Sequence, residues 1–173
     1  RKLLMQIQHL IIGGGAIDDA LGKALQEFPH AVWSTYGMTE TLSHIALRRL
    51  NGSDHSDWYT PFDNVSLSLS EENTLIIHAP SVCSELLRTN DIAEFNQHGL
   101  FRILGRKDNT INTGGVKVQI EQVEKELKPL LDCPFMITSV PDPKFGERIV
   151  LLIEAVHINH EQINESIKKL PPF

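Results

Sequence analysis

The sequence predicts an α/β unit followed by an α+β unit. A strand, a glycine turn, a helix and a second strand follow one another over residues 6–34. The charged, turn-forming segment 105–109 then separates this half from a helix and two strands after residue 119. Such segments commonly separate compact units. We therefore expect one domain over residues 1–105 and a second over residues 106–173.

The composition is that of an ordinary globular chain, with 41% hydrophobic and 22% charged residues among 173. Sixteen Lys and Arg against 22 Asp and Glu give a net charge of -6, and basic residues form no run longer than a pair. A nucleic-acid partner is therefore not expected. No apolar run approaches the roughly 20 residues of a membrane span. We expect a cytoplasmic protein, and the oligomeric state stays open.

Metal-ligating residues do not cluster in the sequence. Cys83 and Cys133 are far apart and belong to no Cys-x-x-Cys pair, which indicates two reduced, structural thiols. The eight His residues include no pair with the spacing of a helical zinc site. We expect no zinc.

The first unit begins with a predicted βαβ motif. Residues 6–12 and 31–34 are apolar and β-tolerant, and the segment 18–28 between them has helical spacing, with Asp18 as N-cap and Pro29 as the stop. The apolar helical positions are Leu21, Leu25 and Phe28. Gly13–Gly15 follow the first strand, where ligands of open α/β sheets bind. The alternative is a tight connection only; a Walker-type loop is excluded because no Gly-Lys-Ser or Gly-Lys-Thr follows.

The segment Tyr36–Thr41 reads as a turn between two strands, outside regular structure. Its aromatic ring can stack on a purine, and Gly37 permits unusual backbone angles. The hydroxyl of Thr39 can donate to a phosphate oxygen, and Glu40 can hold the accompanying magnesium ion. Taken alone, the same six residues also fit a polar hairpin loop.

Alternation of apolar and polar residues then predicts a small β sheet or barrel. Its strands are expected after residue 45, at 65–70 and 74–78 as a hairpin, and at 86–95 and 100–104. In the second unit, residues 120–131 read as an amphipathic helix with one apolar stripe: Val123, Leu127, Leu130 and Leu131. Strands at 135–140 and 148–156, a turn at 141–147 and a helix at 160–169 complete it.

Together these segments resemble the adenylate-forming superfamily of acyl-CoA synthetases, peptide-synthetase adenylation domains and luciferases. Gly13–Gly15 resembles its adenine-bordering turn, and 36–41 its Tyr-Gly-x-Thr-Glu signature. Thr89-Asn90-Asp91 falls where the family has Thr-Gly-Asp, and Asn90 is the residue that best tolerates a left-handed backbone there. Segments 104–108 and 113–118 resemble the hinge and glycine segment of the mobile C-terminal domain, and the turn 141–147 also fits.

The resemblance implies the end of a large domain, a βαβ edge plus a small β barrel, and most of a small mobile domain. The family's phosphate loop would lie upstream of Arg1 and its catalytic lysine beyond Phe173, so we expect the 173-residue chain alone to make no acyl-adenylate. The implied reaction activates a carboxylic acid with ATP and Mg²⁺ and transfers the acyl group to CoA.

The resemblance also implies a role for each candidate residue. Thr39, Glu40 and Arg106 would stabilise the phosphate charge, with Glu40 on the metal. The ATP contacts would be Gly13, Gly14, Gly15, Tyr36, Gly37, Thr39, Asp91 and Arg106. Gly114, Gly115 and Lys117 would meet CoA, Ser43 and His44 the acyl group, and Asp108 would be the hinge. The alternatives are a turn aspartate at Asp91, a surface cation at Arg106 and a solvated strand residue at Lys117.

Within the superfamily, residues 41–46 and the short loops are most similar to the o-succinylbenzoate-CoA ligases of menaquinone biosynthesis. Other acyl-CoA synthetases, an enzyme that charges a carrier protein, and a non-catalytic nucleotide-binding module are the alternatives. Most of the acyl pocket would lie outside this sequence, so fold-level similarity does not fix the substrate.

Overall fold

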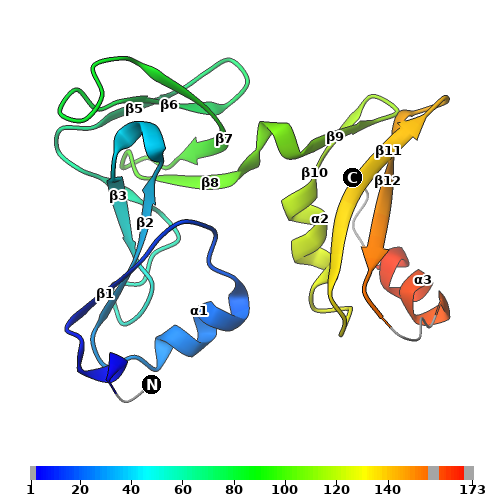
Figure 1. Cartoon of the computed structure of the whole chain (residues 1–173), viewed down its shortest axis with the longest axis horizontal. Coiled ribbons are helices and arrows are strands. Elements are labelled where there is room, and N and C mark those ends of the chain that lie inside the picture. Colours follow the sequence, from blue (N-terminus) through cyan, green and yellow to red (C-terminus); the bar gives the residue numbers. More distant parts are fainter. Residues whose placement is uncertain (1–2, 156–159, 170–173) are drawn as a thin grey trace. The chain divides into compact units, whose positions relative to one another are not determined.

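A computed structural model describes residues 3–155 and 160–169. The chain divides into two compact units, Arg1–Leu104 and Gly105–Phe173 (Figure 1). Both contain more strand than helix, so the fold is a mixed, sheet-rich α/β arrangement. No helix within the described residues is long and apolar enough to cross a membrane.

The first sheet contains the predicted strand–helix–strand succession. Strand β1 (His9–Ile12) is parallel to β2 (Ala31–Gly37), and α1 (Asp19–Gln26) connects them. The predicted N-cap is confirmed, because the Asp18 carboxylate accepts hydrogen bonds from the backbone N–H groups of Ala20 and Leu21 at 2.9 and 3.1 Å. Strand β2 also pairs antiparallel with β3 (His44–Arg49), which pairs with the short β4 (Thr60–Pro61). A 3₁₀ helix, Leu4–Gln6, precedes β1.

A buried amide fixes the connection between α1 and β2. The Asn51 side chain is 2% exposed, and its Oδ1 accepts from the Val32 N–H at 3.0 Å. Its Nδ2 donates to the carbonyls of Phe28 and His30 at 3.0 and 2.9 Å. A buried amide with its donors and acceptor used in this way holds neighbouring segments in one arrangement. The core beneath it is Leu25, Val32 and Leu50.

The second sheet of the first unit consists of β5 (Ser66–Leu69), β6 (Thr74–His78), β7 (Leu87–Phe95) and β8 (Phe101–Arg106), in that order. The predicted β5–β6 hairpin is confirmed by its antiparallel register. The first and last of these described strands are not neighbours, so they form an open sheet where a small barrel was also expected. A core around the fully buried Phe101 joins this sheet to β3 through Ile45 and Ala46.

The segment 36–41, interpreted as a turn outside regular structure, lies in regular structure: Tyr36 and Gly37 end strand β2, and Thr39–Thr41 forms a 3₁₀ helix. The strand expected at 86–95 is confirmed as β7, which contains Asn90 and Asp91. Among the described non-glycine residues only Leu42 and Asn73 have positive φ. The expectation of a left-handed backbone at Asn90 was therefore wrong. Extended backbone at this position needs no glycine.

The described residues of the second unit form a four-stranded sheet with the α-helices α2 and α3. Its strands β9 (Thr110–Thr113), β10 (Val116–Gln119), β11 (Phe135–Asp142) and β12 (Gly146–Ile153) lie in the order β10-β9-β12-β11. Helix α2 (Ile120–Leu127) packs against β10 and β11 (Figure 1), and α3 is His160–Lys168. The core consists of Ile111, Val118, Val123, Leu127, Leu131 and Ile137.

Three boundaries of the second unit differ from expectation. Helix α2 ends at Leu127, and Leu131 reaches the core from the turn that follows. The expected turn 141–147 is mostly strand, since β11 runs to Asp142 and β12 starts at Gly146. Strand β12 ends at Ile153, whereas the strand was expected to reach residue 156, which lies outside the described residues.

Candidate active site

A hydrogen bond joins two of the sequence motifs of the first unit. The phenol of Tyr36, at the end of β2, donates to Oδ2 of Asp91, in β7, at 2.5 Å. The two residues are 55 positions apart. The backbone N–H of Asp91 donates to Oγ1 of Thr89 at 3.1 Å, and that hydroxyl donates to the Leu75 carbonyl at 2.9 Å. Asp91 is therefore held by hydrogen bonds to both its side chain and its backbone.

The Tyr36 ring is anchored in an aromatic cluster. Its centroid lies 5.3 Å from that of Phe101, edge to face, and 6.0 Å from that of Tyr59. The Tyr59 hydroxyl is in turn 2.8 Å from Oγ of the buried Ser34. Aromatic pairs in this geometry add roughly 0.5–1.5 kcal/mol each beyond the area that they bury. Tyr36 therefore has a fixed position, although it is only half-buried.

Glycine is required at position 37 by close approach and not by unusual backbone angles. A Cβ there would lie 2.4 Å from the Ser43 carbonyl oxygen and 2.8 Å from Cα of His44, both backbone atoms. Gly37 is also not among the glycines with positive φ. The residue lets β2 and β3 come together at their bulge, where Gly37 faces His44. The predicted acyl contacts therefore lie next to the signature segment.

The polar residues after Gly37 divide into exposed and buried groups. Thr39 and Glu40 are exposed in the 3₁₀ helix. Thr41 is fully buried: its hydroxyl accepts from the Met38 N–H at 3.0 Å and lies 2.6 Å from the Ser43 carbonyl. Ser43 and His44 are exposed and adjacent, with Oγ 3.2 Å from Nδ1. Thr39, Glu40, Ser43 and His44 are thus accessible to a ligand, whereas Thr41 is not.

The glycine turn after β1 has two kinds of position. A Cβ on Gly13 would meet the Thr35 hydroxyl at 2.4 Å, so the neighbouring strand fills that space. Gly14 has φ of +92° and, like Gly15, has open space where a Cβ would be. Backbone atoms at Gly14 and Gly15 are therefore accessible to a ligand.

In the second unit, the Arg106 guanidinium forms a bidentate contact with Asp108. Its Nε and Nη2 donate to the two carboxylate oxygens at 2.8 and 2.7 Å. Both side chains are 49% exposed. Asp108 belongs to a short 3₁₀ helix, Lys107–Asn109. The predicted hinge residue and the predicted phosphate contact are thus bound to each other.

The predicted CoA contacts lie on the turn between β9 and β10. Gly114 and Gly115 have φ of +59° and +86°, in the left-handed region that favours glycine. The Gly114 N–H donates to the Phe145 carbonyl at 2.8 Å. Lys117 is exposed on β10.

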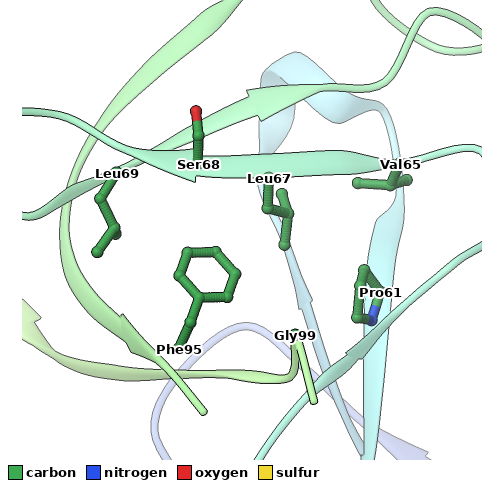
Figure 2. A pocket seen from close by; sticks show the side chains of 7 residues that line it. All are labelled: Pro61, Val65, Leu67, Ser68, Leu69, Phe95 and Gly99. Atoms are coloured by element: carbon green, nitrogen blue, oxygen red, sulfur yellow. The ribbon is translucent and has the colours of Figure 1, made fainter. Parts of the chain in front are cut away.

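Two cavities of the first unit are lined by other residues. One, of about 490 Å³, is apolar: Figure 2 shows Leu67, Leu69 and Phe95 pointing toward the same space and Ser68 pointing away. The other, of about 730 Å³, is lined by residues that include Trp33, Arg48, Arg49 and Trp58. None of the predicted site residues lines either cavity. Within residues 3–155 and 160–169, no group of three His, Cys, Asp or Glu residues could hold a metal ion.

No family model matches the chain. The curated relatives include the 2-succinylbenzoate–CoA ligase of Salmonella typhimurium, 28% identical over 170 residues, which cover 88% of this chain and 36% of the relative. A medium/long-chain-fatty-acid–CoA/3-oxocholest-4-en-26-oate–CoA ligase of Mycobacterium tuberculosis is 36% identical over 66 residues, or 38% of this chain and 12% of the relative. The relatives of this chain are adenylate-forming acid–CoA ligases. The chain spans 36% of the length of the Salmonella ligase.

Solved structures of such ligases share the fold. An acyl-CoA synthetase (AMP-forming)/AMP-acid ligase II-like protein from Dyadobacter fermentans is 29% identical, with a TM-score of 0.56, over 93% of this chain and 47% of that one. The o-succinylbenzoate CoA synthetase of Bacillus subtilis in complex with its acyl-adenylate intermediate is 20% identical, with a TM-score of 0.74, over 95% of this chain and 40% of that one. ATP-bound MatB from Rhodopseudomonas palustris is 20% identical, with a TM-score of 0.77, over 94% and 39%.

Several residues around the ligase-like motifs were missed by sequence reasoning. Phe101 and Tyr59 position Tyr36, and Thr41 holds the turn that carries Glu40. The aromatic residues carry no motif, so nothing in the sequence links them to the site. The sequence shows that Thr41 carries a hydroxyl within the signature. Only the structure shows that this hydroxyl is buried and bonds backbone groups of the turn.

Two carboxylates of the β11–β12 hairpin have lowered pKa values. The Asn112 N–H, and then the Ser139 hydroxyl, hold the pKa of Glu147 below its ordinary 4.5. The N–H groups of Lys144 and Phe145 lower the pKa of Asp142 below 3.8 in the same way. A depressed pKa in the folded state means that the carboxylate stabilises the fold above its unfolded pKa. This stabilisation is lost as pH falls through the folded pKa.

We expect the hairpin to loosen in acid. An NMR titration should show the Asn112 amide shift with a midpoint below 4.5, because the Glu147 carboxylate accepts its hydrogen bond. The Lys144 amide should shift with a midpoint below 3.8, that of Asp142. Midpoints at or above those ordinary values would contradict the assignment of these hydrogen bonds.

Proposed function

We propose that this chain is part of an ATP-dependent acid–CoA ligase that works through an acyl-adenylate, with o-succinylbenzoate as the acid. The observation that carries the proposal is the 2.5 Å hydrogen bond between Tyr36 and Asp91. It brings a candidate adenine contact and a candidate ribose contact together from two separate motifs. The acid–CoA ligases among the relatives support the same reaction class.

The nucleoside would bind along the ends of β1 and β2 and beside β7. The Tyr36 ring, fixed by Phe101, offers an aromatic surface to adenine. An ionised Asp91 is an acceptor only, which suits the two donor hydroxyls of a ribose. The open backbone at Gly14 and Gly15 allows a purine to approach closely. These residues therefore fit a nucleotide chemically.

The triphosphate would lie toward Thr39 and Glu40, both exposed. The Thr39 hydroxyl would donate to a phosphate oxygen. Glu40 would supply one carboxylate to a Mg²⁺ ion, which usually keeps phosphate and water oxygens as its other ligands and neutralises phosphate charge. Arg106 would add positive charge, in competition with its pairing to Asp108.

The proposed reaction has two chemical steps. A carboxylate oxygen of the acid attacks the α-phosphorus, the bond to pyrophosphate breaks, and an acyl-adenylate forms. The thiol of CoA, after losing its proton, then attacks the acyl carbon, and the C–O bond to AMP breaks. Gly114 and Gly115 would let the pantetheine arm pass close to the backbone, with Lys117 as a further contact.

The substrate assignment is tested with the complete reading frame that contains this chain. ATP–pyrophosphate exchange should require o-succinylbenzoate and proceed far more slowly with acetate, a medium-chain fatty acid or benzoate. Chromatography should then detect the CoA thioester when CoA is added. Exchange that prefers a fatty acid would overturn the substrate, and transfer to a carrier protein but not to CoA would overturn the acceptor. No nucleotide binding at all would overturn the ligase proposal.

His44→Ala in that protein is expected to change the ranking of acyl substrates more than the affinity for ATP. The reason is its exposed place beside Gly37, with its ring 5.7 Å from Phe62. Values of kcat/KM for three acids, measured in parallel with the ATP dissociation constant, check this. An unchanged ranking would remove His44 and Ser43 from the acyl pocket.

A further inference from the structure

The tip of the β11–β12 hairpin contacts the glycine turn of the neighbouring β9–β10 hairpin. Gly146 pairs with Thr113, and the Phe145 carbonyl accepts from the Gly114 N–H at 2.8 Å. The Phe145 ring lies against the same glycine, since a Cβ on Gly114 would be 3.1 Å from its Cδ1. The turn is therefore held by a backbone bond and by a ring that leaves no room for a side chain.

Glu147 adds a second attachment two residues before the turn. One of its carboxylate oxygens accepts from the Asn112 N–H at 2.8 Å, and the other accepts from the Ser139 hydroxyl at 2.7 Å. Asn112 belongs to β9 and Ser139 to β11. A single carboxylate on β12 thus ties together the strands on both sides of it. Hydrogen bonds to a charged group are stronger than neutral ones.

The tip itself is closed by Asp142. Its Oδ1 accepts from the N–H groups of Lys144 and Phe145 at 2.9 and 3.0 Å, which fixes the carbonyl that Gly114 uses. The Phe145 ring is 45% exposed, with the Lys144 ammonium 4.9 Å from its centroid. Two consecutive glycines have no side chains that could restrict or anchor their backbone, so the position of the turn depends on these contacts.

We propose that Glu147 and Phe145 are positioning residues for the thiol-transfer step, because they hold the Gly114–Gly115 turn where CoA is to pass. The inference rests on the proposed function and extends it from the glycines to the hairpin that braces them. Backbone that contacts a substrate must be held to within about 0.5 Å. A displacement of about 1 Å can lower a rate on the order of 100-fold.

The test separates the two half-reactions in the complete ligase. Glu147→Ala loses both contacts and should lower kcat/KM for CoA in thioester formation by about 10- to 100-fold. ATP–pyrophosphate exchange should stay within about twofold, because the adenylate contacts proposed above lie elsewhere in the chain. Glu147→Gln should recover most of the loss, since its amide oxygen can accept from Asn112 and its NH₂ can donate to Ser139. Glu126→Ala, an exposed site on α2, controls for the loss of one charge.

A structural readout accompanies the kinetics. Hydrogen exchange of residues 110–118 should be faster in Glu147→Ala than in the wild type and near the wild-type rate in Glu147→Gln. If Glu147→Ala does not fold, Phe145→Ala tests the ring contact alone, with the same direction and a smaller loss. Equal losses in both half-reactions, or an unchanged kcat/KM for CoA, would overturn the inference and leave the ligase proposal intact. A wild-type protein that forms no CoA thioester would overturn both.

Discussion

Asp91→Ala in the complete ligase is expected to raise the ATP dissociation constant about 10- to 150-fold. Removing a charged acceptor from a hydrogen bond typically costs about 1.5–3 kcal/mol, and each 1.4 kcal/mol is a factor of ten in affinity. The carboxylate is held by Tyr36 at 2.5 Å and by the Thr89 hydroxyl through its own backbone N–H. It is therefore already in place before the nucleotide arrives. Calorimetry without the acid measures binding alone.

Comparing ATP with 2′-deoxy-ATP shows whether Asp91→Ala weakens binding by losing a ribose contact or by destabilising the protein. The wild type should prefer ATP, and Asp91→Ala should bind the two nucleotides almost equally. Tyr36→Phe is the matched control: it keeps the ring against Phe101 and Tyr59 but removes the phenol that orients Asp91. Its effect should be smaller and in the same direction. If Asp91→Ala still prefers ATP over 2′-deoxy-ATP and binds ATP as tightly as the wild type, Asp91 is a structural residue of β7.

Local patterns predicted the elements of the first unit but not the contacts among them. The helix after the glycines was readable because Asp18 and Pro29 mark its ends and Leu25 faces the core. The Tyr36–Asp91 bond was not readable, since it joins residues 55 positions apart. It depends on how β2 and β7 meet around Phe101, which no periodicity encodes.

The errors concern the backbone at two motif residues. The strand expected at 86–95 is confirmed, but the left-handed backbone expected at Asn90 is absent, because the Thr89 hydroxyl bonds the Leu75 carbonyl and holds the segment in the extended β7. Gly37 was expected to supply unusual backbone angles, whereas the structure uses its missing side chain for the approach of the Ser43 carbonyl. At both positions tertiary contacts decide the backbone. The motif assigns a residue a candidate role, and packing assigns its conformation.

Asp108→Pro is expected to affect the two half-reactions of the complete ligase very unequally. Two reactions at one adenylate need two sets of neighbours, which a small domain can provide by rotating about a residue that changes its backbone angles. Proline holds φ near −65°, and an arrangement that needs a different φ is destabilised by more than about 1 kcal/mol. That cost corresponds to a loss of more than about fivefold in the population of that arrangement. We expect adenylation to be spared and thioester formation to fall.

The φ that proline imposes lies within the range of a 3₁₀ helix, where Asp108 lies, and Asp108 is not among the described residues with positive φ. Proline also removes the carboxylate that pairs with Arg106, so Asp108→Ala is the necessary control. Loss of this half-exposed ion pair alone should cost no more than about 1 kcal/mol, and Asp108→Ala should keep both activities. Pyrophosphate exchange and thioester formation, measured separately on both variants, decide the matter. Equal losses in Asp108→Pro, together with a lower melting temperature, would make residue 108 an ordinary surface position and not a hinge.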